Sequence, residues 1–214
     1  MIKGVLFDMD GVLVDTEEFI TKAAMEMFRE KGVLTKKEDF KPFTGMGENK
    51  YIGGVAEKYG ISSPIEEMKA KTYEIYGNLV IGKLTPLPGS KDFIGRCRNK
   101  GLKLALASSA DRIKVEINLR ESGIDSEIFQ VIVTGLDVLN KKPAPDIYLK
   151  AAEKLGLRAA DCLVVEDAVS GIKAGKSAGC RCLAVTTSFR SEELDGADWI
   201  CDSLSEAPED SINW

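Results

Sequence analysis

Two aspartates follow a short apolar stretch near the start of the chain, in the sequence VLFDMDG. Val5 to Phe7 predicts a buried strand, and Asp8 and Asp10 stand where that strand ends. Residues i and i+2 of an extended segment project to the same side, so both carboxylates can face one small volume before Gly11 lets the chain turn. Adjacent carboxylates repel, and a hard cation such as Mg²⁺ relieves the repulsion. The pair therefore favours a magnesium site, with a turn carrying two solvated aspartates as the alternative.

Further polar residues follow other predicted strands. The segment ASSAD places Ser108 and Ser109 after one strand, and VVEDAVSG places Glu166 and Asp167 after another. Ligands of open α/β sheets bind beyond the carboxyl ends of the strands, so we expect these groups to lie near the two aspartates. Lys142, in a loop stiffened by prolines, adds an ammonium group. Carboxylates can hold a cation while the ammonium, hydroxyl and backbone N–H groups neutralise phosphate oxygens, so the set predicts a site for metal and phosphate.

The composition excludes several kinds of catalytic site. The 214 residues include no histidine, which rules out a Ser-His-Asp triad, a Cys-His pair and an HExxH zinc site within this chain. The net charge is −5 without a basic block, so we expect no nucleic-acid partner. No apolar run approaches the roughly 18 residues of a membrane span, and the two aspartates interrupt any signal peptide. We therefore expect a globular protein in the cytoplasm, without membrane insertion, whose five cysteines are reduced core thiols.

Short apolar strands alternate with helices over most of the chain. This alternation predicts a parallel sheet covered by helices on both faces. We therefore expect an α/β fold with a doubly wound parallel sheet of the Rossmann-like type. Beyond the first strand, the expected helices span residues 91–100, 112–122, 146–155 and 170–177, and the expected strands span 103–107, 131–134, 162–165 and 182–185.

A helical block interrupts the alternation directly after the first strand. Apolar residues recur at helical spacing between Phe19 and Phe28, two further helices are expected over 50–59 and 66–79, and TPLPGS then reads as a linker. We predict an α/β core domain of residues 1–15 and 86–214 and a helical cap domain of residues 16–85. Asp15 is expected to hydrogen-bond to the backbone at the hinge, and Thr16 to cap the first helix of the cap.

In this order, the motifs resemble those of the haloacid dehalogenase (HAD) superfamily. DMDGVLVD matches its first motif, ASS its second, KKPAPD its third and VVEDAVSG its fourth. The β-phosphoglucomutase-like branch is the most similar. Within it, PFTGMGENKYIGGVAEKYG and LALASSADRIKVEINL resemble HAD-like phosphatase domains of a plant and algal subset. The resemblance implies a HAD core, a mobile cap and Mg²⁺ as cofactor.

The resemblance also assigns roles to the matching positions. Asp8 would be the nucleophile that forms an aspartyl-phosphate, and Asp10 would protonate the leaving oxygen and then activate water. The implied activity is the Mg²⁺-dependent hydrolysis of a small phosphomonoester. Phosphate binding would fall to Ser108, Ser109, Lys142 and Gly11. Metal binding would fall to Asp8, Asp10 through its carbonyl, Asp167 and, directly or through water, Glu166.

The cap departs from the pattern of the mutases in this branch. Those enzymes carry a cap histidine where this chain has Ile20, and a cap arginine for the substrate's second phosphate near the place of Glu48. A carboxylate there would repel a second phosphate, unless Lys50 or Lys71 replaced the arginine. We therefore favour a phosphatase with a small phosphorylated metabolite as its partner. A phosphosugar mutase and a regulatory or interaction module on a HAD scaffold are the alternatives.

One segment of the chain resembles a nucleotide-binding motif. GIKAGKS, from Gly171 to Ser177, resembles a nucleotide-binding P-loop, but it is one residue short and falls within a predicted helix, so we expect it to pack against the sheet.

The plant and algal resemblance offers two alternatives to a free-standing cytoplasmic protein. The chain would be part of a larger multidomain protein, and its compartment would be the chloroplast stroma.

Overall fold

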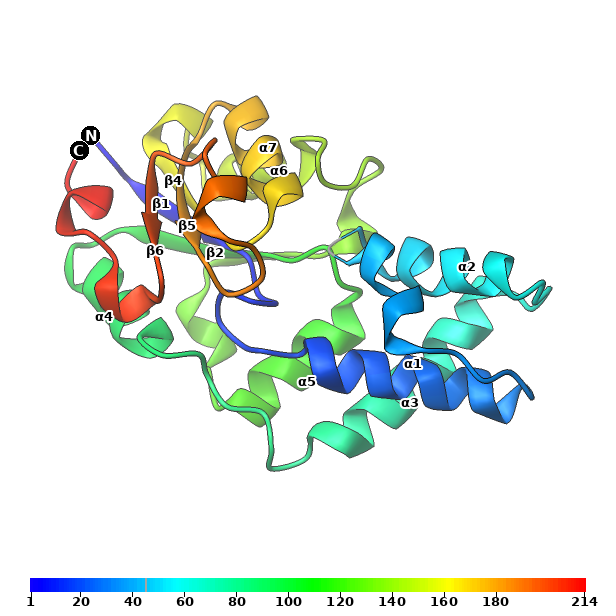
Figure 1. The fold of residues 1–214 in the computed structure, drawn as a ribbon. Helices are drawn as coiled ribbons and strands as arrows, with labels where there is room; N and C mark the ends of the chain where they lie inside the picture. Colours follow the sequence, from blue (N-terminus) through cyan, green and yellow to red (C-terminus); the bar gives the residue numbers. More distant parts are fainter. Residues whose placement is uncertain (45) are drawn as a thin grey trace.

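A six-stranded parallel sheet organises the protein, whose computed structural model describes residues 1–44 and 46–214 (Figure 1). The strand order is β3-β2-β1-β4-β5-β6, which is the order of a doubly wound sheet and confirms the predicted fold. The sequence did not indicate β6. The strands are β1 Gly4–Phe7, β2 Lys103–Ala107, β3 Val131–Val133, β4 Cys162–Glu166, β5 Arg181–Val185 and β6 Trp199–Cys201.

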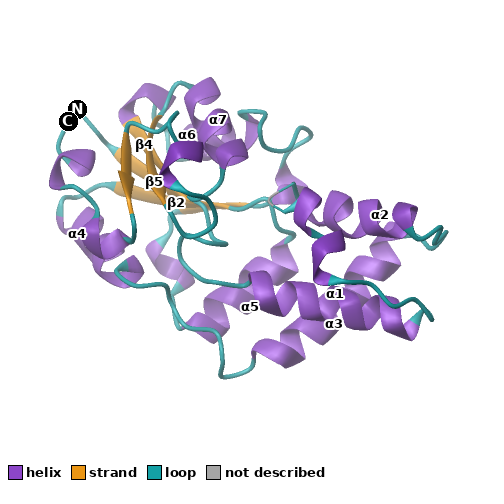
Figure 2. Ribbon diagram, viewed as in Figure 1, coloured by secondary structure: helices purple, strands orange, loops and turns teal. Residues whose placement is uncertain are grey.

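Helices cover both faces of this sheet, as the continuous apolar runs of its central strands require (Figure 2). Alternate residues of β1 join opposite layers: Phe7 packs on Phe93 with ring centroids 6.0 Å apart, whereas Leu6 belongs to the other cluster. One layer contains α4 (Ser90–Asn99) and α5 (Arg112–Ser122), and the other contains α6 (Asp146–Lys154) and α7 (Val169–Ala178).

A helical cap is inserted between β1 and α4 and lies to one side of the sheet (Figure 1). Its helices are α1 (Glu17–Glu30), α2 (Glu48–Lys58) and α3 (Ile65–Val80), and α1 packs along α3. The two chain segments that join cap and core lie side by side, since Leu87 N–H donates to the Leu13 carbonyl at 2.9 Å. The predicted cap insertion is thereby confirmed, while the domain boundaries at 15/16 and 85/86 stay a prediction.

The segment GIKAGKS lies within helix α7. Gly171, Ile172 and Ala174 are buried, so the segment packs against the sheet as expected and does not form a phosphate-binding loop. The five cysteines are free thiols in buried positions. Within the described residues, none of the helices combines the length and apolar character that a membrane crossing requires.

Candidate active site

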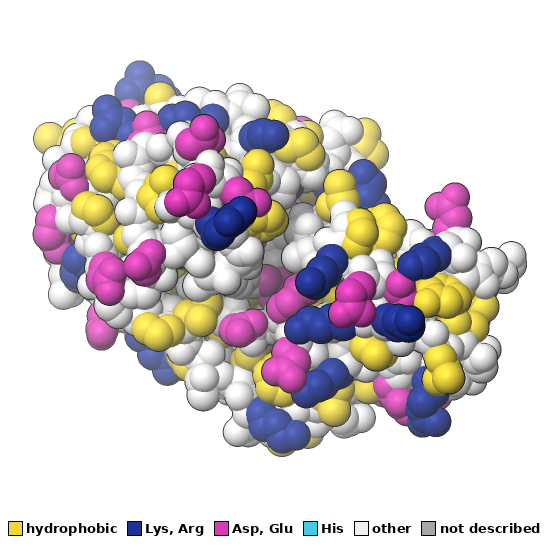
Figure 3. Space-filling view, viewed as in Figure 1, with side chains coloured by type: hydrophobic (Ala, Val, Ile, Leu, Met, Phe, Trp, Pro, Cys, Tyr) yellow, Lys and Arg dark blue, Asp and Glu magenta, His cyan; other side chains and the backbone are white. Residues whose placement is uncertain are grey.

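A pocket lies between the sheet and the cap, where the space-filling view shows a hollow between two lobes (Figure 3). It is at the carboxyl ends of β1, β2 and β4. The chain winds in opposite directions from β1 and β4, and such a switch point is where doubly wound sheets bind ligands. The pocket brings together the residues predicted for the site, which are Asp8, Asp10, Gly11, Ser108, Ser109, Lys142, Glu166 and Asp167.

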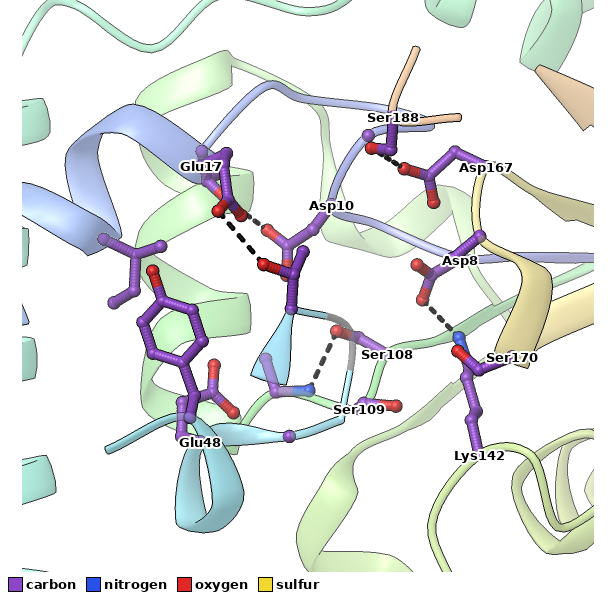
Figure 4. Close-up of a pocket in the computed structure, with 18 of the residues that line it drawn as sticks. Asp8, Asp10, Glu17, Glu48, Ser108, Ser109, Lys142, Asp167, Ser170 and Ser188 are labelled. Atoms are coloured by element: carbon purple, nitrogen blue, oxygen red, sulfur yellow. Dashed lines mark hydrogen bonds and ion pairs between the residues drawn. The ribbon is translucent and has the colours of Figure 1, made fainter. Parts of the chain in front are cut away.

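Asp8 directly follows β1 and is buried on the core side of the pocket. Its Oδ1 accepts a hydrogen bond from Lys142 Nζ at 2.8 Å (Figure 4). Burial raises the pKa of Asp8 to about 7, Lys142 opposes this rise, and the negative charge of Glu166 adds to it. The bond to Lys142 engages one Asp8 oxygen, and the second can react or bind a cation.

Glu166, the last residue of β4, is fully buried and holds Lys142 in place. Its Oε1 accepts hydrogen bonds from Lys142 Nζ at 2.6 Å and from the Tyr148 hydroxyl at 2.8 Å. Its Oε2 accepts from the backbone N–H groups of Asp167 and Ala168, each at 3.0 Å. Both oxygens are thus bonded within the protein, and Glu166 positions Lys142. A direct or water-mediated role of Glu166 in metal binding stays a prediction.

Asp167 lies against the turn that follows β1. Its Oδ2 accepts a hydrogen bond from the Ser188 hydroxyl (Figure 4). Gly11 has a φ of 75°, and a Cβ there would stand 1.9 Å from Asp167 Oδ2, so only glycine permits this approach. Gly11 is predicted to bind phosphate, but in this structure its N–H donates to the Val14 carbonyl at 2.8 Å. What Gly11 contributes in this structure is room for Asp167, and its phosphate contact stays a prediction.

The carboxylates of Asp8, Glu166 and Asp167 form the cluster that could hold a metal ion. One oxygen from each lies within 4.8 Å of the others. Burial, followed by the charges of Glu166 and Asp8, raises the pKa of Asp167 well above its ordinary value. Without a cation, these crowded and buried carboxylates are costly to ionise. Because carboxylate oxygens are hard ligands, the cluster fits Mg²⁺ well. The Asp10 carboxylate is not part of this cluster. The metal contact predicted for Asp10 is through its backbone carbonyl, and that contact stays a prediction.

The Asp10 carboxylate instead faces the cap. Its Oδ1 accepts hydrogen bonds from the Thr16 hydroxyl at 2.5 Å and from Asn118 Nδ2 at 3.3 Å, and its Oδ2 accepts from Lys114 Nζ at 2.8 Å. The expectation that Thr16 caps α1 is wrong, because its hydroxyl makes this bond and no capping bond. Asp15 does bond to the backbone as expected, accepting from the Glu17 N–H at 3.3 Å. Asp8 and Asp10 therefore face different parts of one pocket.

Ser108 and Ser109 follow β2 on the core side of the pocket. The Ser108 N–H donates to the Val133 carbonyl at 3.0 Å, which extends the sheet by one residue and fixes the turn. The Ser108 hydroxyl oxygen accepts from the Ala110 N–H at 3.2 Å, so its own hydrogen can still be donated to a ligand. Figure 4 shows both serines between Glu48 and Lys142.

Sequence reasoning missed several polar residues of the site, among them Lys114, Asn118 and Ser188. Lys114 and Asn118 lie one turn apart on α5, and both are buried with their polar groups on Asp10. This i, i+4 spacing of polar residues on a buried helix face is a signal that could have found them. Ser188 follows β5 in a loop, and nothing in its local sequence indicates its bond to Asp167.

On the cap side, Glu48 lines the pocket as expected. Lys50 is exposed and Lys71 pairs with two cap glutamates, at 3.5 and 3.1 Å, on the outer surface. Neither lysine is among the described residues that line the pocket. They therefore do not replace the missing arginine in this arrangement. Gly45, three residues before Glu48 in the sequence, lies outside the described residues.

Known proteins of this architecture resemble the chain closely. A family model described as haloacid dehalogenase-like hydrolase matches residues 5–185. Protein SUPPRESSOR OF QUENCHING 1, chloroplastic, of Arabidopsis thaliana is 42% identical over 199 residues, covering 92% of this chain but 19% of that protein. Phosphorylated carbohydrates phosphatase of Thermotoga maritima is 32% identical over 178 residues, covering 83% of this chain and 82% of the relative.

The likeness extends to solved structures. The crystal structure of CbbY from Rhodobacter sphaeroides in complex with phosphate superposes with a TM-score of 0.89 at 30% identity, covering 100% of both chains. Sequence and fold thus agree with the resemblance carried by the four motifs. The chain belongs to the haloacid dehalogenase-like hydrolase family.

Proposed function

We propose that this protein is a Mg²⁺-dependent phosphatase that hydrolyses a small phosphomonoester through an aspartyl-phosphate intermediate. The observation that carries the proposal is the environment of Asp8. Its carboxylate accepts a hydrogen bond from the ammonium of Lys142 and belongs to the cluster with Glu166 and Asp167, and the Asp10 carboxylate lines the same pocket. This is the charge arrangement that phosphoryl transfer requires.

The first half of the reaction forms the covalent intermediate. An oxygen of Asp8 attacks phosphorus, the bond from phosphorus to the leaving oxygen breaks, and Asp10 gives its proton to that oxygen. Lys142 and the hydroxyls of Ser108 and Ser109 bind the phosphoryl oxygens. Mg²⁺, held by Asp8, Asp167 and the Asp10 carbonyl, would neutralise charge on the phosphoryl group.

The second half releases phosphate and restores the enzyme. Asp10 takes a proton from a water molecule, whose oxygen attacks phosphorus, and the bond between phosphorus and Asp8 breaks. Lys114 and Asn118 hold the Asp10 carboxylate in place for both proton transfers. Cap closure would keep bulk water out of the first half.

Named relatives support a phosphatase, and two features of this chain weigh against the other readings. The Thermotoga maritima relative is named a phosphatase of phosphorylated carbohydrates, and the CbbY crystal contains phosphate. Against a mutase, the cap presents Glu48 to the pocket where a cation for a second phosphate is needed. Against a regulatory module, the chain retains every residue that the chemistry uses. We propose the cytoplasm as its compartment, or the chloroplast stroma if it is a domain of a longer plant protein.

Phosphate release from a panel of phosphorylated metabolites tests the proposal. The panel comprises sugar phosphates, phosphoglycolate, nucleotides and pyridoxal phosphate, each with and without Mg²⁺, for the wild type beside Asp8→Asn. We expect Mg²⁺-dependent release that the variant lacks. Equal background release by both proteins would shift the assignment to a regulatory module.

Metal binding can be measured without turnover. Because burial raises the pKa of Asp8 and of Asp167, the metal-free folded state holds protons that the unfolded state has already released. Its stability should therefore fall as pH rises from about 4 to 7, and Mg²⁺, which competes with those protons, should restore it. We expect Mg²⁺ to raise the melting temperature more at pH 8 than at pH 5, and Asp167→Asn to reduce this gain. A gain independent of pH would contradict the proposed ligands.

Gly171 tests the positioning of Lys142 by Glu166. A Cβ at Gly171 would stand 1.7 Å from Glu166 Oε1 and 2.4 Å from Oε2, so Gly171→Ala must displace that carboxylate. Lys142 then loses one of its two acceptors, and we expect kcat to fall on the order of 10²-fold, as for other small misplacements of catalytic groups.

The matched control is Gly95→Ala in helix α4, where a Cβ meets nothing within 4 Å. This variant should keep wild-type activity and gain up to about 1 kcal/mol of stability from helix propensity. If Gly171→Ala is as active as the control, Glu166 does not position Lys142.

A further inference from the structure

Glu48, the first residue of α2, lines the pocket and carries a buried carboxylate oxygen without a hydrogen-bond partner among the described residues. The side chain is 8% exposed and lines the pocket from the cap side (Figure 4). Its Oε1 lies 3.5 Å from Lys114 Nζ, whereas Oε2 is buried and has no hydrogen-bond partner among the described residues. An unpaired buried acceptor is costly, so Oε2 is a place for a donor from a bound molecule.

Lys114 connects this oxygen to the reaction centre. Its ammonium contacts Asp10 Oδ2 at 2.8 Å and Glu48 Oε1 at 3.5 Å. Burial lowers the pKa of Lys114, but the charges of Asp10 and Glu48 outweigh this and raise it, so the cation is firmly held. Asp10 is the proposed proton donor to the leaving oxygen. Glu48 therefore faces the part of the substrate that carries that oxygen, not the phosphoryl group.

The charges that line the pocket limit what the leaving group can be. On the cap side, the described lining residues include the acidic Glu17 and Glu48 and neither lysine nor arginine. The lining cations, Lys114 and Lys142, come from the core, and each is already paired with two carboxylates. A second phosphate or a carboxylate on the leaving group would meet negative charge without a free cation. Thr44 and Tyr51 also line the pocket; their hydroxyls pair with Glu17 at 3.3 Å and with Thr21 at 2.7 Å, and each oxygen can still accept a bond from a polyol hydroxyl.

We propose that Glu48 selects the leaving group. Its Oε2 accepts a hydrogen bond from a hydroxyl of a polyol or sugar monophosphate whose leaving group is uncharged, and the negative charge of Glu48 excludes bisphosphates and phosphorylated acids. This inference deepens the proposed phosphatase function and rests on it. The discrimination arises because a buried carboxylate gains one bond from the correct substrate and repels the wrong one.

Matched substrates test this selection. Glycerol 3-phosphate is paired with 3-phosphoglycerate, and fructose 6-phosphate with fructose 1,6-bisphosphate, and p-nitrophenyl phosphate serves as a probe without hydroxyls. In the wild type we expect kcat/KM to favour the member with the uncharged leaving group at least about tenfold in each pair, and Glu48→Gln to reduce that ratio by about tenfold. The kcat/KM for p-nitrophenyl phosphate reports any change in the chemical step that all substrates share. Glu57→Gln, an exposed change on the same helix, should leave every ratio unchanged.

Further variants and substrates separate the outcomes. Glu48→Asp keeps the charge but withdraws the oxygen, so it should still reject the anionic partners while losing affinity for the polyols. This variant also decides the matter if Glu48→Gln does not fold. An unchanged ratio in both variants would overturn the proposal, as would a preference for phosphoethanolamine, which would assign Glu48 to an ammonium group.

Failure of the proposed function would look different. If the wild type hydrolyses nothing, p-nitrophenyl phosphate included, then phosphatase activity is wrong but selection can still be measured as binding. Calorimetry of Asp8→Asn with the same pairs would show tighter binding of the member with the uncharged leaving group. The double variant Asp8→Asn/Glu48→Gln should show a smaller difference in affinity between the two members. Equal affinities for both members would overturn the inference by itself.

Discussion

Replacement of Asp8 by asparagine should reduce phosphate release by about 10³-fold or more, a loss on the order of 4 kcal/mol of transition-state stabilisation. The amide is nearly isosteric with the carboxylate but cannot displace an alcohol from phosphorus. Lys142 keeps Glu166 as a partner, so the fold should survive. Because the variant removes a buried carboxylate whose pKa is raised by burial, its melting temperature without Mg²⁺ should not fall.

The control is Asp195→Asn, an exposed carboxylate outside the pocket. It makes the same chemical change and should leave turnover unaltered. Steady-state phosphate release and thermal melting of the three proteins check both expectations. If Asp8→Asn keeps activity within tenfold of the wild type, Asp8 is not the nucleophile. This conclusion holds whether or not phosphate release depends on Mg²⁺.

The second large effect is expected from Asp10→Asn. General acid–base groups contribute about 10²- to 10⁴-fold, so turnover of alkyl phosphates should fall by that amount. The first step on p-nitrophenyl phosphate should be less affected, because nitrophenolate leaves without a proton. Hydrolysis of the aspartyl-phosphate still needs a base, so this intermediate should accumulate.

Rapid-mixing kinetics of Asp10→Asn should therefore show a burst of nitrophenol of about one equivalent per enzyme, followed by slow turnover. Mass spectrometry of the quenched protein would show the mass of one phosphoryl group on Asp8. A uniform loss of activity on alkyl and nitrophenyl phosphates, without a burst, would mean that Asp10 supports the fold or the metal and transfers no proton. The asparagine has one acceptor oxygen where the aspartate has two, so it can keep the bond from Lys114 while its amide nitrogen faces the Thr16 hydroxyl, which can accept.

Most of the fold and the centre of the site follow from local sequence patterns. The strand predicted over 103–107 and the helix predicted over 112–122 match β2 and α5 at both ends, and other elements differ by a few residues. Apolar strands bounded by turns have a short-range signal that tertiary contacts do not need to correct. β6 was missed because it has only three residues, two of them half-buried, so its pattern is too short to distinguish from a loop.

The sequence also placed Asp8, Ser108, Lys142 and Asp167 in one pocket. It could do so because parallel strands direct their carboxyl ends to one edge, whatever their order in the sheet. The roles of Glu166 and Gly11 were less accessible. The bond between Glu166 and Lys142 joins residues that no pattern within one segment connects, and the bonds of Glu166 to the following backbone depend on the exact turn. The 1.9 Å approach that forbids a Cβ at Gly11 comes from Asp167, more than a hundred residues further along the chain.

By itself, then, the sequence determined the α/β class, the cap insertion and the carboxylates at the strand ends, because these depend on periodicity within single segments. Only the tertiary structure decided that β1 lies beside β4, that Thr16 bonds to Asp10 and leaves its helix uncapped, and that Lys114 links Asp10 to Glu48. The first depends on strand pairing across the sheet, and the other two depend on how the cap and α5 pack at the sheet edge. Such packing reflects shape and burial between distant segments, for which a single sequence carries no local signal.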